Sequence, residues 1–296
     1  MFIHKPHLQY HARPERPDPL FAMKLQEVIG GQWGEMSVMM QYLFQGWNCR
    51  GPAKYRDMLF DIGTEEIGHV EMLATMVARL LEGADANTVE SAAKGSSPVA
   101  AVLGGASPKD MILSAAMNPQ HIIVSGQGAM PADSLGNRWT AAYICASGNL
   151  LADFRLNLTA ESQGRVQVAR LYNMTEDPGV RDLLSFLLAR DTMHQNQWLA
   201  AIEELEADGL DRTPCPMNFP AENEAGEFSY QYLQFSEGGA SAQGRWASGP
   251  APDGRGTFQF VSEPMAHGSP LGFESPGEPR FYGTPPEPVP PTAVAR

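Results

Sequence analysis

Apolar residues recur every three or four positions over four long stretches of the chain, which predicts four amphipathic helices. The stretches span residues 20–47, 52–83, 148–174 and 178–205. Gly51-Pro52 separates the first two, and Asp177-Pro178 opens the fourth with a proline in the favoured first turn. Residues 84–136 form a long connection rich in Gly, Ser, Ala and Pro, with a helical piece expected at 108–116. Such a crossover between parallel second and third helices is typical of the ferritin-like four-helix bundle.

The two ends of the chain lack this helical period. Residues 1–19 carry four prolines and predict an arm that is ordered or packs against a partner. Residues 213–296 hold 14 of the 24 prolines, and two aromatic segments within them, 228–235 and 257–261, fit short strands. This tail has apolar surface to bury, so we expect it to wrap a neighbouring subunit. The predicted divisions are an arm at 1–19, an all-α bundle at 20–210 and an extended Pro/Gly-rich C-terminal segment at 211–296.

Each predicted helix carries an acidic residue within its apolar stretch, and two of these acids precede a histidine by three residues. A spacing of three places both side chains on one helix face, where they can bind one metal ion. An unpaired carboxylate among apolar residues is costly, and Glu35 lies between Trp33 and Met36. Ferritin-like bundles bind two metal ions through one Glu from each of two helices and Glu-x-x-His from the other two. The matching contributions are Glu35, Glu66-x-x-His69, Glu161 and Asp191-x-x-His194.

Four further residues lie outside this set of ligands. Tyr42, two turns after Glu35, would place a phenol near whatever Glu35 binds. Asp57 and Asp61 form an i, i+4 pair that faces away from Glu66, and solvated acids near a helix start are the simpler interpretation. His121, in the long connection, has no partner at helical spacing and is interpreted as structural.

Composition narrows the class of protein. The 296 residues are 43% hydrophobic and 19% charged, as in a soluble globular protein. A net charge of −13 argues against nucleic acid as a partner. Three widely spaced cysteines without a CxxC motif disfavour a disulfide framework or a thiolate metal site and favour the cytoplasm. No apolar run is long enough to span a membrane.

Several long segments resemble the manganese catalases, a non-haem family with two manganese ions. The resemblance covers nearly the whole chain and is strongest in residues 118–131, 160–165, 171–178, 191–198 and 244–250. It implies disproportionation of hydrogen peroxide to water and oxygen while the metals cycle between Mn(II)₂ and Mn(III)₂. It also implies a homo-hexamer with interlocking tails and, in some members, calcium bound at positions that match Asp57 and Asp61.

The resemblance also implies a role for each candidate site residue. The manganese ligands would be Glu35, Glu66, His69, Glu161 and His194, with Glu66 bridging the two ions. Tyr42 matches an outer-sphere tyrosine, and Asp191 stands where some relatives have a Glu that hydrogen-bonds solvent at the metals. An arginine that some members place before the third-helix Glu is replaced by Ala160, and Arg165 is a candidate substitute one turn later.

Two alternatives remain open from the residues themselves. Imidazole and carboxylate ligands suit both manganese and iron, so a ferritin-like di-iron oxidase or iron-handling protein fits the same pattern. A coat or shell protein that uses the bundle only as a scaffold fits less well, because buried acids without a metal would destabilise its core.

Overall fold

The computed structural model describes residues 3–82, 124–209, 223–235 and 237–268. The chain divides into two compact units, Met1–Asn218 and Phe219–Arg296. The helical piece expected at 108–116 and His121 lie outside the described residues.

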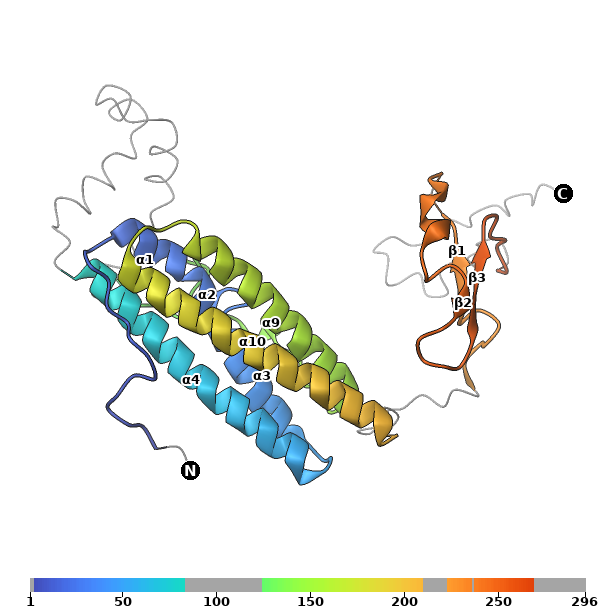
Figure 1. Ribbon diagram of the computed structural model, residues 1–296, viewed down its shortest axis with the longest axis horizontal. Coiled ribbons are helices and arrows are strands. Elements are labelled where there is room, and N and C mark those ends of the chain that lie inside the picture. The colour runs from blue at the N-terminus through green and yellow to red at the C-terminus, as the bar shows by residue number, and fades with distance from the viewer. Residues whose placement is uncertain (1–2, 83–123, 210–222, 236, 269–296) are drawn as a thin grey trace, which may run out of the picture. The chain divides into compact units, whose positions relative to one another are not determined.

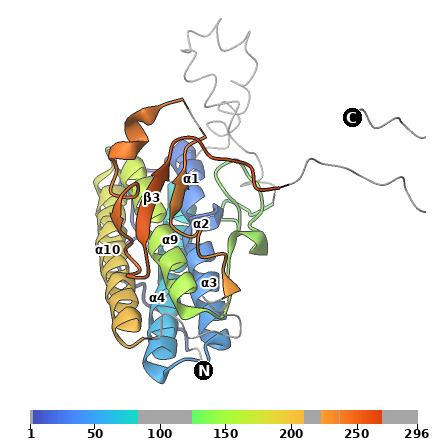
Figure 2. The same ribbon diagram turned by 90° about the vertical axis from the view of Figure 1, so that its right-hand side faces the viewer.

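Four long helices form the first unit (Figures 1 and 2). They are α3 (Glu35–Asn48), α4 (Ala53–Leu81), α9 (Leu150–Tyr172) and α10 (Pro178–Ala207). Short connections join α3 to α4 and α9 to α10, and each pair packs as antiparallel neighbours. Helices α4 and α9 run toward the same end of the bundle (Figure 1). The predicted ferritin-like arrangement with its long crossover is confirmed, and the later three helices begin and end within about two residues of the predicted bounds.

The prediction of one continuous helix over residues 20–47 is wrong. This stretch is divided into α1 (Pro19–Leu25), α2 (Glu27–Gly30) and α3, and the chain is non-helical from Gly31 to Gly34. A side chain at Gly30 would collide with the backbone of Ala132 in the connection before α9. The same connection is fixed by Gln26, whose amide donates to the carbonyls of Met130 and Ala132 at 2.7 and 2.8 Å. A tertiary contact therefore breaks a continuous apolar period and places Glu35 in the first turn of α3.

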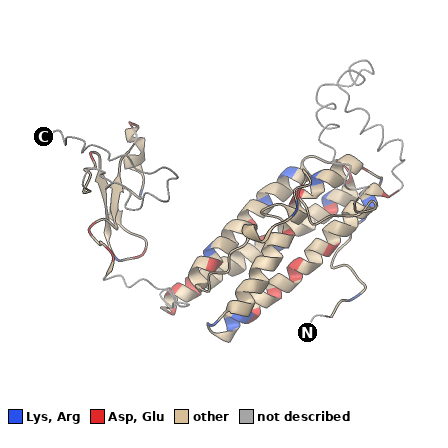
Figure 3. Ribbon diagram, turned by 180° about the vertical axis from the view of Figure 1, so that it is seen from behind, with Lys and Arg blue, Asp and Glu red and all other residues tan. Residues whose placement is uncertain are grey.

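The apolar core of the bundle consists of two clusters at different levels along the helices. One contains the end of α4 from Met72, the end of α9 from Val168 and the start of α10 as far as Leu187. The other contains the start of α4 as far as Ile62, the start of α9 and the end of α10 from Trp198. Between them lies a layer of buried polar and charged side chains. Acidic residues, in red, are spread along the helices of the bundle (Figure 3).

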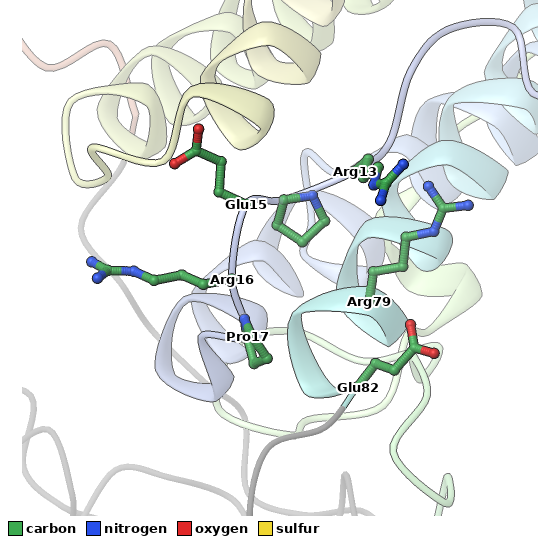
Figure 4. Close-up of a pocket in the computed structure, with 7 residues that line it drawn as sticks. Arg13, Glu15, Arg16, Pro17, Arg79 and Glu82 are labelled. Carbon is green, nitrogen blue, oxygen red and sulfur yellow. The ribbon is translucent and has the colours of Figure 1, made fainter.

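The N-terminal arm is ordered against its own bundle. The Tyr10 hydroxyl donates to Asp182 at 3.0 Å, and its ring stacks on Phe186 with centroids 4.3 Å apart. Arg79 donates to the Ala12 carbonyl at 2.6 Å. Where the arm passes the end of α4, a hollow of about 430 Å³ is lined by Arg13, Pro14, Glu15, Arg16, Pro17, Arg79 and Glu82. Arg13 and Arg79 lie next to each other on one side of it (Figure 4).

The second unit contains a small three-stranded sheet. Strand β3 (Thr257–Val261) is central, pairing in parallel with β1 (Gln231–Leu233) and antiparallel with β2 (Gly249–Pro250). Both aromatic segments that fit strands in the sequence therefore contribute one, with Tyr232 opposite Phe260. Among the described helices, none combines the length and the apolar character needed to cross a membrane.

Candidate metal centre

The layer between the two apolar clusters gathers one or two side chains from each long helix. Two of these helices, α9 and α10, start at a side-chain cap that fixes where the helix begins. The Asn149 side chain caps α9 by accepting from the Ala152 amide at 3.0 Å, and Asp177 caps α10 by accepting from the Val180 amide at 3.0 Å. The buried members of the layer are Glu35, Glu66, His69, Glu161, Asp191 and His194.

Glu66 lies at the middle of the layer, between the two histidines. One of its carboxylate oxygens is 2.6 Å from Nδ1 of His69, and the other is 2.8 Å from Nδ1 of His194. The side chains of Glu66, His69 and His194 are fully buried. Each half of one carboxylate therefore faces a different imidazole, which is the arrangement required of a bridging ligand.

A second carboxylate completes each half of the centre. Glu35 lies 3.6 Å from Nδ1 of His69, and Glu161 lies 3.6 Å from Nδ1 of His194. Two groups of three ligand atoms result, Glu35–Glu66–His69 and Glu66–Glu161–His194, and the atoms of each group lie within 4.8 Å of one another. The structure thus brings together all five residues that the resemblance assigns to manganese, in two groups that share Glu66.

Several buried polar atoms of this centre do not form hydrogen bonds with one another. Both oxygens of Glu66, both nitrogens of His69 and Nδ1 of His194 are buried and have no hydrogen-bond partner among the described residues. Buried polar atoms without partners are rare and destabilising. Carboxylate oxygens and imidazole nitrogens that converge without hydrogen-bonding are the donor set of a first-row transition metal. The residues therefore fit a pair of metal ions.

Burial and the close approach of charged groups shift the pKa values of the residues in this centre. Burial and, after it, the negative charge of Glu66 raise the pKa of the Glu35 carboxyl to about 8. Burial opposes a charged His194, but the nearby carboxylates of Glu66, Glu161 and Glu65 raise its pKa to about 12. The two imidazolium charges hold the pKa of Glu66 below its usual range, although burial opposes this. Without metal, protons on the histidines therefore balance the central carboxylate.

Tyr42 and Asp191 flank the centre in different ways. The fully buried Tyr42 hydroxyl donates to Glu161 at 2.6 Å, so the phenol contacts a candidate ligand on α9. Asp191 is buried, and its carboxylate has no hydrogen bond or ion pair with any described residue. Burial, followed by the charges of Glu35, Glu161 and Glu66, raises the pKa of Asp191 well above its usual value. Asp191 precedes His194 by three residues on α10, so both side chains lie on the same helix face.

One residue of the centre was missed by reasoning from the sequence. Glu65 lies behind the histidines, 3.1 Å from Nε2 of His194 and 3.7 Å from Nε2 of His69. Arg190 pairs with Glu65 at 2.6 Å. The signal available in the sequence is a pair of four-residue spacings, from Glu65 to His69 and from Arg190 to His194.

Two other candidate residues, Asp57 and Asp61, lie apart from the centre. Both are exposed on α4 and, within the described part of the chain, join no third metal-type ligand. Asp57 lies 3.5 Å from Arg56. Arg165, the candidate substitute for the family's arginine, donates to Gln195 at 3.2 Å.

Comparisons with known proteins agree with this geometry. The family model for manganese-containing catalases matches residues 1–281. The chain is 58% identical over 268 residues to the manganese catalase of Bacillus subtilis (strain 168), covering 90% of this chain and 93% of the relative. It is 44% identical over 282 residues to the manganese catalase of Lactiplantibacillus plantarum, covering 95% and 98%. The crystal structure of KatB, a manganese catalase from Anabaena, superposes with a TM-score of 0.66 at 27% identity, covering 89% of this chain and all of that one. The chain therefore belongs to the family of manganese-containing catalases.

Proposed function

We propose that this chain converts hydrogen peroxide to water and oxygen at two manganese ions bridged by Glu66. Membership of the family makes the chain a manganese-dependent catalase; the number of ions and the ligand assignment are the proposal. The observation that carries it is the shared position of Glu66, whose two oxygens face two imidazoles at 2.6 and 2.8 Å. Glu35 and His69 would hold one ion, and Glu161 and His194 the other.

Two manganese ions bound in this centre would supply the redox chemistry, taking up and returning two electrons as each changes between +2 and +3. The chain's own contribution is to hold the ions, to exclude competing water and to manage protons. Three carboxylates and two neutral imidazoles suit manganese without soft sulfur ligands. The apolar clusters above and below the layer restrict solvent.

Asp191 is the residue that we propose handles protons. Peroxide cleavage consumes protons and peroxide oxidation releases them, so a carboxyl that changes protonation beside the ions serves both halves of the reaction. Asp191 fits this role because its carboxyl is buried, lies on the same helix face as His194 and is not paired with any described residue. Tyr42 would hold Glu161 in place through its 2.6 Å hydrogen bond, which keeps that carboxylate oriented toward His194.

We further propose that the C-terminal segment holds subunits of a homo-oligomer together. Its support is the combination of high proline content with exposed aromatic and apolar side chains. In the second unit, Phe235, Trp246 and Met265 are 84%, 58% and 79% exposed. Such side chains are suited to burial against another subunit.

Metal analysis combined with an oxygen-evolution assay tests the proposed function. The purified protein should contain two manganese ions per chain and should evolve oxygen from hydrogen peroxide. Insensitivity to cyanide at concentrations that stop haem enzymes should accompany this activity. Protein that carries two manganese ions but evolves no oxygen would refute the proposal. Protein that is active only when loaded with iron would favour the di-iron alternative.

A further inference from the structure

We propose that Glu65 is a positioning residue that orients both histidines of the metal centre from behind, and that the N-terminal arm helps to hold it in place. The inference rests on the proposed metal centre, because it assigns a role toward the ions that the histidines would bind. It concerns a carboxylate outside the five candidate ligands and gives the arm a part in the site.

The geometry places each imidazole between two carboxylates. On the inner side, Nδ1 of both rings faces Glu66. On the outer side, Oε2 of Glu65 is 3.1 Å from Nε2 of His194, and Oε1 is 3.7 Å from Nε2 of His69. The two rings are nearly parallel, with centroids 5.7 Å apart and planes inclined by 24°. One carboxylate can therefore serve both rings.

The chemical consequence concerns which nitrogen can bind a metal ion. A neutral imidazole carries one proton, and a carboxylate near one nitrogen favours that proton on the same nitrogen. Glu65 lies within hydrogen-bond distance of Nε2 of His194 and close to Nε2 of His69, so it favours the ring protons on these outer nitrogens. The Nδ1 lone pairs of both rings then point into the centre. Carboxylates that accept from the outer nitrogen of a ligating histidine commonly fix its orientation and raise its basicity.

Glu65 is itself held by a charged partner. Arg190 donates to Oε1 through Nε at 2.6 Å and to Oε2 through Nη2 at 3.1 Å. This two-point contact between guanidinium and carboxylate fixes direction as well as distance. Arg190 lies one turn before His194 on α10, and Glu65 lies one turn before His69 on α4. The contact therefore also ties together the two helices that carry the histidines.

The N-terminal arm supplies the remaining support. Gln9 donates to Oε1 of Glu65 at 2.7 Å. The arm approaches α4 closely at Gly68, where an added Cβ would lie 3.2 Å from the Gln9 side-chain oxygen. The next arm residue, Tyr10, stacks on Phe186, whose ring meets His69 edge-on at 6.5 Å. The arm thus contacts the carboxylate that faces both histidines and covers an aromatic ring that contacts one of them.

Manganese affinity of the folded protein is the appropriate readout, because a purely structural role would leave it unchanged. We would measure the dissociation constants of native protein, Glu65→Gln and the control Glu71→Gln by competition with a chelator, after confirming helical content by circular dichroism. Glu71 lies on the same helix and also contacts the arm, pairing with His4 at 2.7 Å. Glu65→Gln should bind both ions about 10- to 100-fold more weakly. Glu71→Gln should match native protein.

Unchanged affinity in folded Glu65→Gln would overturn the inference, and weakening of one ion alone would overturn the shared role. Gln9→Ala offers a second test that leaves the bundle intact, and it should weaken manganese binding about twofold to tenfold through loss of one hydrogen bond to Glu65. Native affinity in that variant would remove the arm from the site. If native protein binds no manganese, the proposed function and this inference both fail. If native protein binds manganese and both Glu65→Gln and Gln9→Ala bind it with the same affinity, this inference alone fails.

Discussion

Replacing Glu66 by glutamine should abolish tight binding of both manganese ions together. The three candidate carboxylates carry −3 against the +4 of two divalent ions, and Glu66→Gln removes one of those charges without changing the size of the side chain. It also replaces one carboxylate oxygen by an amide NH₂. That oxygen lies either 2.6 Å from Nδ1 of His69 or 2.8 Å from Nδ1 of His194. Removing one partner from a buried ionic group costs about 3–5 kcal/mol. Two unit charges 4 Å apart at an effective dielectric constant of 20 give a similar value, about 4 kcal/mol.

At about 1.4 kcal/mol per tenfold, this loss corresponds to manganese binding that is roughly 10²- to 10⁴-fold weaker. Manganese content after dialysis against graded chelator concentrations measures the effect, and oxygen evolution should fall in parallel. Glu206→Gln is the matched control, because Glu206 is exposed at the far end of α10 and pairs only with Arg155 among the described residues. Native affinity for both ions in Glu66→Gln would refute the bridging role, and loss of one ion alone would make Glu66 a ligand to a single metal.

Four further outcomes follow from the same geometry. Asp191→Asn should retain both manganese ions and lose about 10²- to 10⁴-fold in turnover; metal loss would instead make Asp191 a ligand, and unchanged turnover would make it structural. Tyr42→Phe should retain both ions and lower the free energy of unfolding by about 1–3 kcal/mol in urea titration, because buried Glu161 loses a donor; unchanged stability would argue against the contact. Deletion of residues 213–296 should give a smaller oligomer by sedimentation, and an unchanged assembly would contradict the proposed role of the tail. Manganese affinity should rise with pH across the neutral range, because the folded pKa of His194 is raised to about 12 and the ion must displace that proton; pH-independent affinity would contradict this.

The apolar period, with the prolines at 52 and 178, was sufficient to predict the helices that carry Glu66, Glu161 and His194. The break before Glu35 was not predictable in the same way, because it depends on the backbone of Ala132, about 100 residues later in the sequence. The apolar period of residues 20–47 does not indicate that contact.

Glu65 was overlooked for a different physical reason. It is adjacent to Glu66 and therefore points about 100° away around α4, where an acid is normally solvated. Its importance depends on two rings that turn their outer nitrogens toward it and on Arg190 from another helix. The orientation of an imidazole is set by packing and is not encoded in residue spacing.

The division of the bundle core into two apolar clusters makes manganese supply a determinant of how much folded enzyme exists. The polar layer interrupts the core on α4, α9 and α10 at one level, so each half buries its own apolar surface. Ions that bind only the native state raise its free energy of unfolding. Each site adds about 2.7 kcal/mol when free metal is at 100 times its dissociation constant. When manganese is scarce, we therefore expect the protein to lose stability as well as activity. The backbone beside the layer would then open locally and become accessible to proteases.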